Sequence, residues 1–303
     1  WAWYGGDDTD VGARTEVSVG DTMTYDYYLD DVLVYTENQT ILDVKDGIAI
    51  VAYVYGDINP RVKAVDVGIA GVTVPTDMLG DVMGSETIDT PFGEKECQIM
   101  PYSYDGILYR GWFADNGVQY MSEYTENLTG MVIRIVLKET SLFDEAPTMG
   151  KADILGAGTP AVDDLYCQSL VSFGTGGASV TNSYYDINSI ESGKSLIVYW
   201  SDIVPIDIMV MDTEEFASLW TASGPEAVGT ETVATVWGFV DATVTREVVD
   251  YGDGTSSVTT YWNDGSGAMV KFQVAVMDGD ETIDTMTSYV IANGSMVLGG
   301  QSS

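Results

Sequence analysis

Alternation of apolar and polar residues with a period of two runs along most of this sequence, and it constrains the fold more than any other feature. In "TMTYDYYL", residues 22–29, Met23, Tyr25 and Tyr27 would face one side and the polar residues between them the other. Side chains of a β-strand alternate between two faces in this way, and Thr, Val and Tyr, which fill these stretches, favour strands. We therefore predict an all-β fold of antiparallel strands, arranged as sandwiches or meanders, with very little helix.

Turn signals separate the predicted strands. Asp46-Gly47 divides residues 41–45 from the apolar run 48–55, and Gly252 to Gly254 divides two further alternating runs. Asp-Gly and Gly-rich pairs suit the tight turns of β-hairpins because those turns need positive φ angles. Two short helices are also expected, at residues 75–83 and at 212–220, and Asp212 would cap the second.

A stretch in the first half is echoed in the second. Residues 86–93, "ETIDTPFG", align with residues 231–238, "ETVATVWG", and each is followed by a Trp, an Asp/Asn/Gly turn and an alternating strand. These tryptophans are Trp112 and Trp262. We interpret the echo as an internal repeat of a β-meander. The paired aromatic residues then serve the scaffold, although a carbohydrate-binding platform is the alternative.

Composition predicts three regions. Residues 1–145 and 179–303 are rich in predicted strands, whereas 146–178 are rich in Gly, Ala and Thr and contain Pro147 and Pro160. Such a composition is typical of a connector. We therefore expect two β-rich halves joined by residues 146–178.

The charge is strongly negative. The chain has 47 Asp and Glu against 12 Lys and Arg, a formal net charge of −35. Nucleic acids and anionic membrane surfaces would be repelled, so neither is expected as a partner. No apolar run reaches the length of about 18 residues that a membrane span needs.

Several features suggest export to the extracellular space or the cell surface. The sequence begins "WAWYGG" without Met, as a mature protein does after removal of a signal peptide. Three Asn-x-Ser/Thr sequons predict N-glycosylation, at Asn38, Asn127 and Asn293. The two cysteines, Cys97 and Cys167, fit a disulfide within one chain or between chains, and the sequence leaves that choice open.

The sequence offers little chemistry for catalysis. It contains no His, which removes Ser-His-Asp and Cys-His nucleophiles and the commonest general base. "GTGGAS" lacks the Lys-Ser/Thr ending of a phosphate-binding loop. We expect that the protein is not an enzyme; a glycosidase that uses two carboxylates is a distant third possibility.

Calcium is the cation that the carboxylate-rich turns suggest. Asp7, Asp8 and Asp10 lie together in "GGDDTDVG", although the spacing is not that of a known calcium loop. No cofactor is expected otherwise.

Two runs, "IAIVAYVY" and "MVIRIVL", are strongly β-forming and contain no Pro. Such segments pair edge to edge unless they are protected. They either lie inside their sheets or serve assembly between chains. The residues predicted for assembly are Ile48, Ile50, Val51, Tyr53, Val132, Ile133, Ile135 and Val136.

The acidic, Thr/Val/Tyr/Gly-rich β-sequence with its "ENQT" and "ENLT" sequons resembles archaeal cell-envelope proteins, and in size it is similar to structural subunits of methanogen sheaths and surface layers. Residues 193–220 resemble strands of small β-sandwich domains in such exported proteins. The resemblance implies a homopolymeric sheath, filament or surface lattice. The first hypothesis is therefore a self-assembling structural protein, and the alternative is a secreted β-sandwich module that binds a glycan or a lipid.

Overall fold

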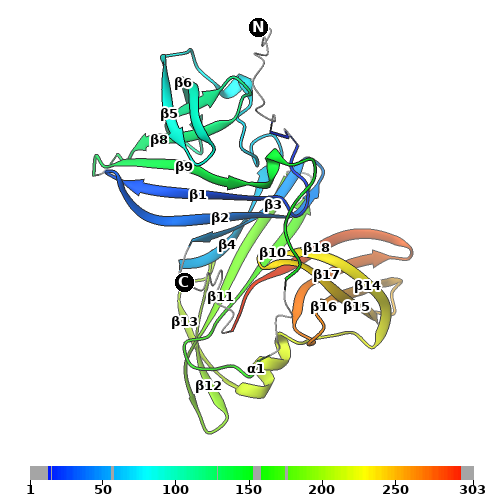
Figure 1. The fold of residues 1–303 in the computed structure, drawn as a ribbon. Helices are drawn as coiled ribbons and strands as arrows, with labels where there is room; N and C mark the ends of the chain where they lie inside the picture. Colours follow the sequence, from blue (N-terminus) through cyan, green and yellow to red (C-terminus); the bar gives the residue numbers. More distant parts are fainter. Residues whose placement is uncertain are drawn as a thin grey trace. The chain divides into compact units, whose positions relative to one another are not determined.

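The computed structural model describes residues 13–14, 16–55, 58–127, 129–152, 158–174 and 177–294 (Figure 1). The chain forms two compact units. Unit 1 comprises Trp1–Ile58 and Val65–Met149, and unit 2 comprises Asn59–Ala64 and Gly150–Ser303. The strands form two nine-stranded antiparallel sheets, and the two halves are similar. This confirms the all-β prediction.

The first sheet has the strand order β4-β3-β2-β1-β9-β8-β7-β6-β5. Two 3-10 helices, η1 (Thr76–Met78) and η2 (Ser141–Phe143), accompany it. Its strands are β1 (Thr22–Leu29), β2 (Val32–Lys45), β3 (Ile48–Tyr55), β4 (Ile58–Asp66), β5 (Gly84–Thr90), β6 (Gly93–Tyr104), β7 (Ile107–Ala114), β8 (Gln119–Thr125) and β9 (Val132–Thr140).

The second sheet has the order β13-β12-β11-β10-β18-β17-β16-β15-β14. The helix α1 (Thr213–Leu219) follows β13, and the Asp212 side chain caps it by accepting from the Glu214 backbone N–H at 3.0 Å, as predicted. The strands are β10 (Leu165–Gly174), β11 (Gly177–Glu191), β12 (Lys194–Ser201), β13 (Asp207–Asp212), β14 (Glu226–Thr235), β15 (Gly238–Asp250), β16 (Thr255–Asn263), β17 (Met269–Asp278) and β18 (Glu281–Gly294).

The two strand orders correspond strand for strand, so that β1 matches β10 and β5 matches β14. The register irregularities also correspond. The break between Thr24 and Tyr25 against β9 recurs between Cys167 and Gln168 against β18. A bulge of this kind is a specific feature of a strand pair, so its repetition supports a duplicated scaffold.

Side-chain contacts repeat as well. The indole N–H of Trp112 donates to the Glu86 carboxylate at 2.9 Å, and that of Trp262 donates to Glu231 at 2.7 Å. These are the residues that the sequence alignment had paired. Trp112 and Trp262 are 4% and 7% exposed, which confirms the scaffold interpretation. The carbohydrate-platform alternative for them is wrong, because a buried ring cannot stack on a ligand.

Each sheet curls on itself. The edge strand β5 contacts β9, and β14 contacts β18, although neither pair is adjacent in its sheet. The concave side of each curl can therefore bring distant strands opposite one another. In unit 1 the main core contains Met23, Ile41, Val51, Trp112 and Leu137.

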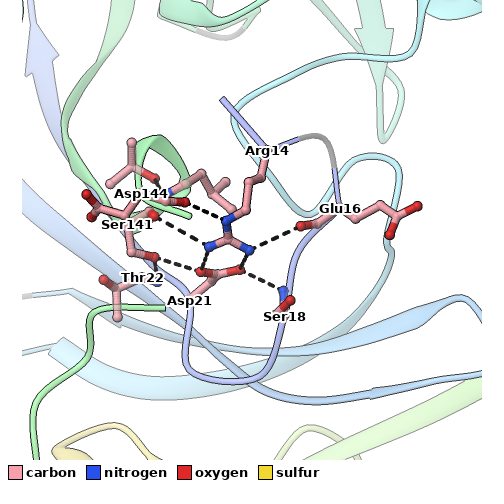
Figure 2. Close-up of polar contacts among 9 residues, drawn as sticks. Arg14, Glu16, Ser18, Asp21, Thr22, Ser141 and Asp144 are labelled. Carbon is pink, nitrogen blue, oxygen red and sulfur yellow. Dashed lines mark hydrogen bonds and ion pairs between the residues drawn. The ribbon is translucent and has the colours of Figure 1, made fainter. Parts of the chain in front are cut away.

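A buried ion pair links the segment that precedes β1 to the segment that follows β9 (Figure 2). Arg14 binds Asp21 through both of its terminal nitrogens and donates from Nε to the Asp144 carbonyl at 2.8 Å. Asp21, whose side chain is 0% exposed, also accepts from the Ser141 hydroxyl and from the Ser18 backbone N–H, at 2.8 and 2.6 Å. Every oxygen of this carboxylate thus has partners, which is what a buried charge requires.

The predicted connector is shorter than its composition suggested. β10 occupies Leu165–Gly174, inside the predicted range 146–178, and β11 begins at Gly177. β10 pairs with β11 and β18 in the middle of its sheet. The Gly- and Ser-rich composition around it obscured a strand in which the alternate residues Cys167, Ser169 and Val171 are buried.

The two runs predicted for assembly are interior strands. β3 lies between β4 and β2, and β9 lies between β1 and β8. Because both edges of each strand are already paired, no backbone ladder is left for another chain. The edge role predicted for Ile48, Ile50, Val51, Tyr53, Val132, Ile133, Ile135 and Val136 is therefore wrong.

Cys97 and Cys167 are free thiols in this structure, and both are buried. Cys97 belongs to unit 1 and Cys167 to unit 2. The disulfide within the chain is therefore not formed here. A bridge between chains stays a prediction, and it would require a thiol to leave its core.

Candidate binding face

Tyrosines gather on one face of the first sheet, around Glu37. Tyr25 on β1 lies opposite Glu37 on β2, which lies opposite Tyr55 on β3. Residues directly opposite each other in an antiparallel pair share a face. Tyr27 and Tyr35, two residues along the same strands, share it too.

The same face continues onto β6, β7 and β8. Tyr102 lies opposite Tyr109, whose ring is 5.1 Å from that of Tyr124. Tyr124 in turn lies opposite Ile133 of β9, and Ile133 lies opposite Leu29 of β1. We call this surface the tyrosine face; it consists of Tyr25, Tyr27, Tyr35, Tyr53, Tyr55, Tyr102, Tyr104, Tyr109 and Tyr124.

The curl of the sheet brings its two tyrosine groups close together. Burial, Glu37 and the Tyr102 hydroxyl raise the pKa of Tyr25 well above its ordinary 10.0. Burial, Glu37 and then Tyr104 raise the pKa of Tyr53 in the same way. Tyr102 and Tyr104 lie on β6, four strands from β1 in the order of the sheet. Their influence on β1 and β3 agrees with the curl that brings β5 into contact with β9.

Several of the rings form close pairs. Tyr27 and Tyr35 stack with centroids 4.5 Å apart at 20°, and Tyr102 and Tyr109 stack at 5.0 Å and 11°. Tyr102 is buried at 9% exposed, Tyr104 is 37% exposed, and the other seven tyrosines are partly buried. Apart from Tyr102, the face therefore offers flat aromatic surface that a ligand can reach.

Polar groups lie among the rings. Glu37, only 2% exposed, accepts a hydrogen bond from the Gln39 amide at 2.6 Å and lies 3.4 Å from the Tyr27 hydroxyl. Burial, followed by Glu37, also raises the pKa of Tyr27 above 10.0. Tyr25, Tyr27 and Tyr53, whose pKa values lie above the ordinary 10.0, are protonated at neutral pH as tyrosines normally are, so that their hydroxyls can donate as well as accept.

Unit 2 builds the same sheet almost without these tyrosines. The strand registers of the two sheets identify the equivalent positions. The pair Tyr27–Tyr35 between β1 and β2, for example, corresponds to the pair Leu170–Thr181 between β10 and β11. Glu37 corresponds to Ser183, and only Tyr53 keeps a tyrosine, Tyr199. The other replacements are Gln168 for Tyr25, Leu170 for Tyr27, Thr181 for Tyr35, Ser201 for Tyr55, Glu247 for Tyr102, Val249 for Tyr104, Thr259 for Tyr109 and Val274 for Tyr124.

The sequence-based predictions missed this face. The alternation in residues 22–29 was visible, but the prediction used it only to place a strand. A signal was present: Tyr density is high in 22–55 and 102–124, and the aligned residues of the other half lack it. Using that signal would have required the alignment to extend over the whole chain.

The other predicted sites are scattered. Asp7, Asp8 and Asp10 lie outside the described residues, and within the described part no group of three or more acidic or thiol side chains is placed to hold a metal ion. Asn38 and Asn127 are exposed, whereas Asn293 is 7% exposed on β18. Glycosylation stays a prediction at all three. No helix in the described ranges is long and apolar enough to span a membrane.

Comparisons with known proteins are sparse. No family model and no curated protein matches the chain. Among solved structures, MucB is 11% identical with a TM-score of 0.29, covering 86% of this chain and 90% of that one. The Pseudomonas aeruginosa MucA/MucB complex gives 11% identity and a TM-score of 0.26, over 90% and 88%. A DUF3598-family protein from Nostoc punctiforme gives 8% and 0.22, over 90% and 96%. Similarities this low carry no argument about function.

Proposed function

We propose that this chain is an exported, non-enzymatic binding protein whose tyrosine face holds a glycan or a lipid. The observation that carries the proposal is the difference between the two units. Since unit 2 forms the same nine-stranded sheet with Gln, Leu, Thr, Ser, Glu and Val at the equivalent positions, the fold does not need the tyrosines. Partly exposed aromatic rings with a few polar groups on a concave surface are typical of ligand sites.

Alanine substitutions on opposite sides of the face test the proposal. We expect Tyr27→Ala combined with Tyr109→Ala to weaken binding at least about tenfold, since each change removes one ring of a stacked pair. Binding is measured by isothermal titration calorimetry against soluble neutral oligosaccharides and the apolar probe N-phenyl-1-naphthylamine. The unit 2 variant Tyr251→Ala, at a residue that is 59% exposed, is the matched control. Wild-type affinity in the double variant would refute the proposal.

Self-assembly through sheet edges is the second candidate, now moved from β3 and β9 to β13. β13 is an edge strand, and its Ile208 and Val210 are 63% and 65% exposed. The preceding loop adds Ile203 and Ile206, at 77% and 73%. Exposed apolar side chains on an open edge favour pairing with another chain, here a second copy of the same protein.

Lysine substitutions on this edge test the candidate. We expect Ile208→Lys with Val210→Lys to abolish large oligomers, because charged edge residues prevent strand pairing. Size-exclusion chromatography with light scattering in high salt measures the oligomers. Ile283→Lys, at a position that is 58% exposed in β18, is the control. A wild-type chain that stays monomeric at high concentration would rule assembly out.

A further inference from the structure

We propose that the ligand of the tyrosine face is a neutral oligosaccharide and not a lipid, an inference that rests on the proposed binding function. The face combines flat aromatic surface with closely spaced hydrogen-bonding groups, and it lies on a strongly anionic protein. Each of these three properties favours one ligand class over another.

The stacked rings provide surfaces that suit a sugar ring. Tyr27 with Tyr35 and Tyr102 with Tyr109 form two nearly parallel pairs, with ring centroids 4.5 and 5.0 Å apart, and in the second pair Tyr109 is the ring that is partly exposed. The C–H groups on one side of a pyranose pack against such rings, because aromatic faces carry partial negative charge and are apolar. Pairs on both sides of the curl can hold successive sugar units of one chain.

The polar groups discriminate against a lipid. Gln39 is partly exposed, lies opposite Tyr53 and shares the face with the tyrosine hydroxyls, whereas Glu37 and Ser122 on the same face are already buried. An acyl chain covering the Gln39 amide and the exposed Tyr104 would remove water from their polar groups without returning hydrogen bonds, which is unfavourable. Sugar hydroxyls both donate and accept, so they replace the water that is displaced.

The charge of the protein selects a neutral sugar. With a formal net charge of −35, the surface repels uronic acids, sialylated chains and phosphorylated glycans. The tyrosines contribute hydroxyls without charge at neutral pH, because their ordinary pKa of 10.0 lies well above it and burial raises the pKa of Tyr25, Tyr27 and Tyr53 further. A neutral hexose oligomer meets neither repulsion nor an unmatched polar surface.

Phenylalanine substitutions separate the two ligand classes, because they remove the hydroxyl and keep the ring. We expect wild-type protein to bind at least one member of a panel of neutral hexasaccharides of glucose, mannose and galactose. Tyr27→Phe and Tyr109→Phe should each weaken that binding about threefold to tenfold, as loss of one hydrogen bond does. Tyr251→Phe in unit 2 should leave it unchanged, and far-ultraviolet circular dichroism verifies that the variants fold.

The outcomes separate the identity of the ligand as a neutral sugar from the proposed binding role of the tyrosine face. Binding of N-phenyl-1-naphthylamine that is lost in the Tyr27→Ala, Tyr109→Ala double variant, with no saccharide bound, overturns the sugar inference and leaves a lipid-binding face. Saccharide binding that is insensitive to Tyr27→Phe and Tyr109→Phe also overturns it, since the hydroxyls would then play no part. If neither the saccharides nor the apolar probe binds, both the sugar inference and the proposed binding function are refuted.

Discussion

Asp21 shows how one side chain can organise the start of a unit. Its carboxylate receives Arg14, the Ser141 hydroxyl and the Ser18 backbone N–H. Asp164 occupies the equivalent place before β10 and accepts from the Ala161 backbone N–H at 2.7 Å. The duplication thus extends to a single buried carboxylate at the entry of each sheet.

Removing this charge should be costly. We expect Asp21→Asn to lower the free energy of unfolding by about 3 kcal/mol, because it leaves the guanidinium of Arg14 partly buried without its counter-charge. Urea unfolding followed by tryptophan fluorescence measures the change. The exposed pair of Lys151 and Asp241 provides the control, since Asp241→Asn should have no measurable effect. Equal effects of the two substitutions would show that the Asp21 network contributes little.

At the scale of elements, the local sequence pattern predicted where strands occur, but it did not predict which strands lie next to each other in the sheet. The Asp46-Gly47 turn adopts positive φ angles of 52° and 78°, as its sequence requires, and Ser192-Gly193 repeats it at 52° and 76°. By contrast, the apolar character of β3 and β9 fits an interior strand and an exposed edge strand that pairs with another chain equally well. Only the strand order, which depends on pairings across the whole unit, separates the two.

At the scale of the whole molecule, duplication allows the halves to divide their roles. Both units keep the Trp–Glu hydrogen bond, the bulges and the turns. Only unit 1 carries the tyrosine face around Glu37. A repeated scaffold whose second copy lacks a feature is an internal control for that feature, and it identifies the tyrosines as candidates for function without reference to any relative.

The tyrosines also predict how stability depends on pH. Their pKa is raised in the folded state, so the unfolded chain ionises first, near pH 10.0, and the free energy of unfolding should fall as pH rises above that value. The buried thiol of Cys97, whose pKa burial raises to about 11, acts in the same direction from about pH 9. Urea midpoints between pH 7 and pH 11, with tyrosine absorbance at 295 nm, measure the effect.

Tyr27→Phe should reduce the loss of stability above pH 10, because it removes one ionisable hydroxyl from the buried set. Midpoints that do not change up to pH 11 would contradict the expected dependence. A single tyrosine titration step near pH 10 in the folded protein would do so as well.

By itself, the sequence determined what depends on near neighbours: the alternating strands, the Asp-Gly turn, the Asp212 cap, the buried Trp112 and Trp262 of the repeat, and the negative charge. The tertiary structure alone decided that β3 and β9 are interior and that β10 is a strand within the predicted connector. It also decided that tyrosines of β1–β3 and β6–β8 share one concave face. The reason is physical: strand propensity and turn geometry act over a few residues, whereas register and curl arise from pairings between residues about a hundred positions apart.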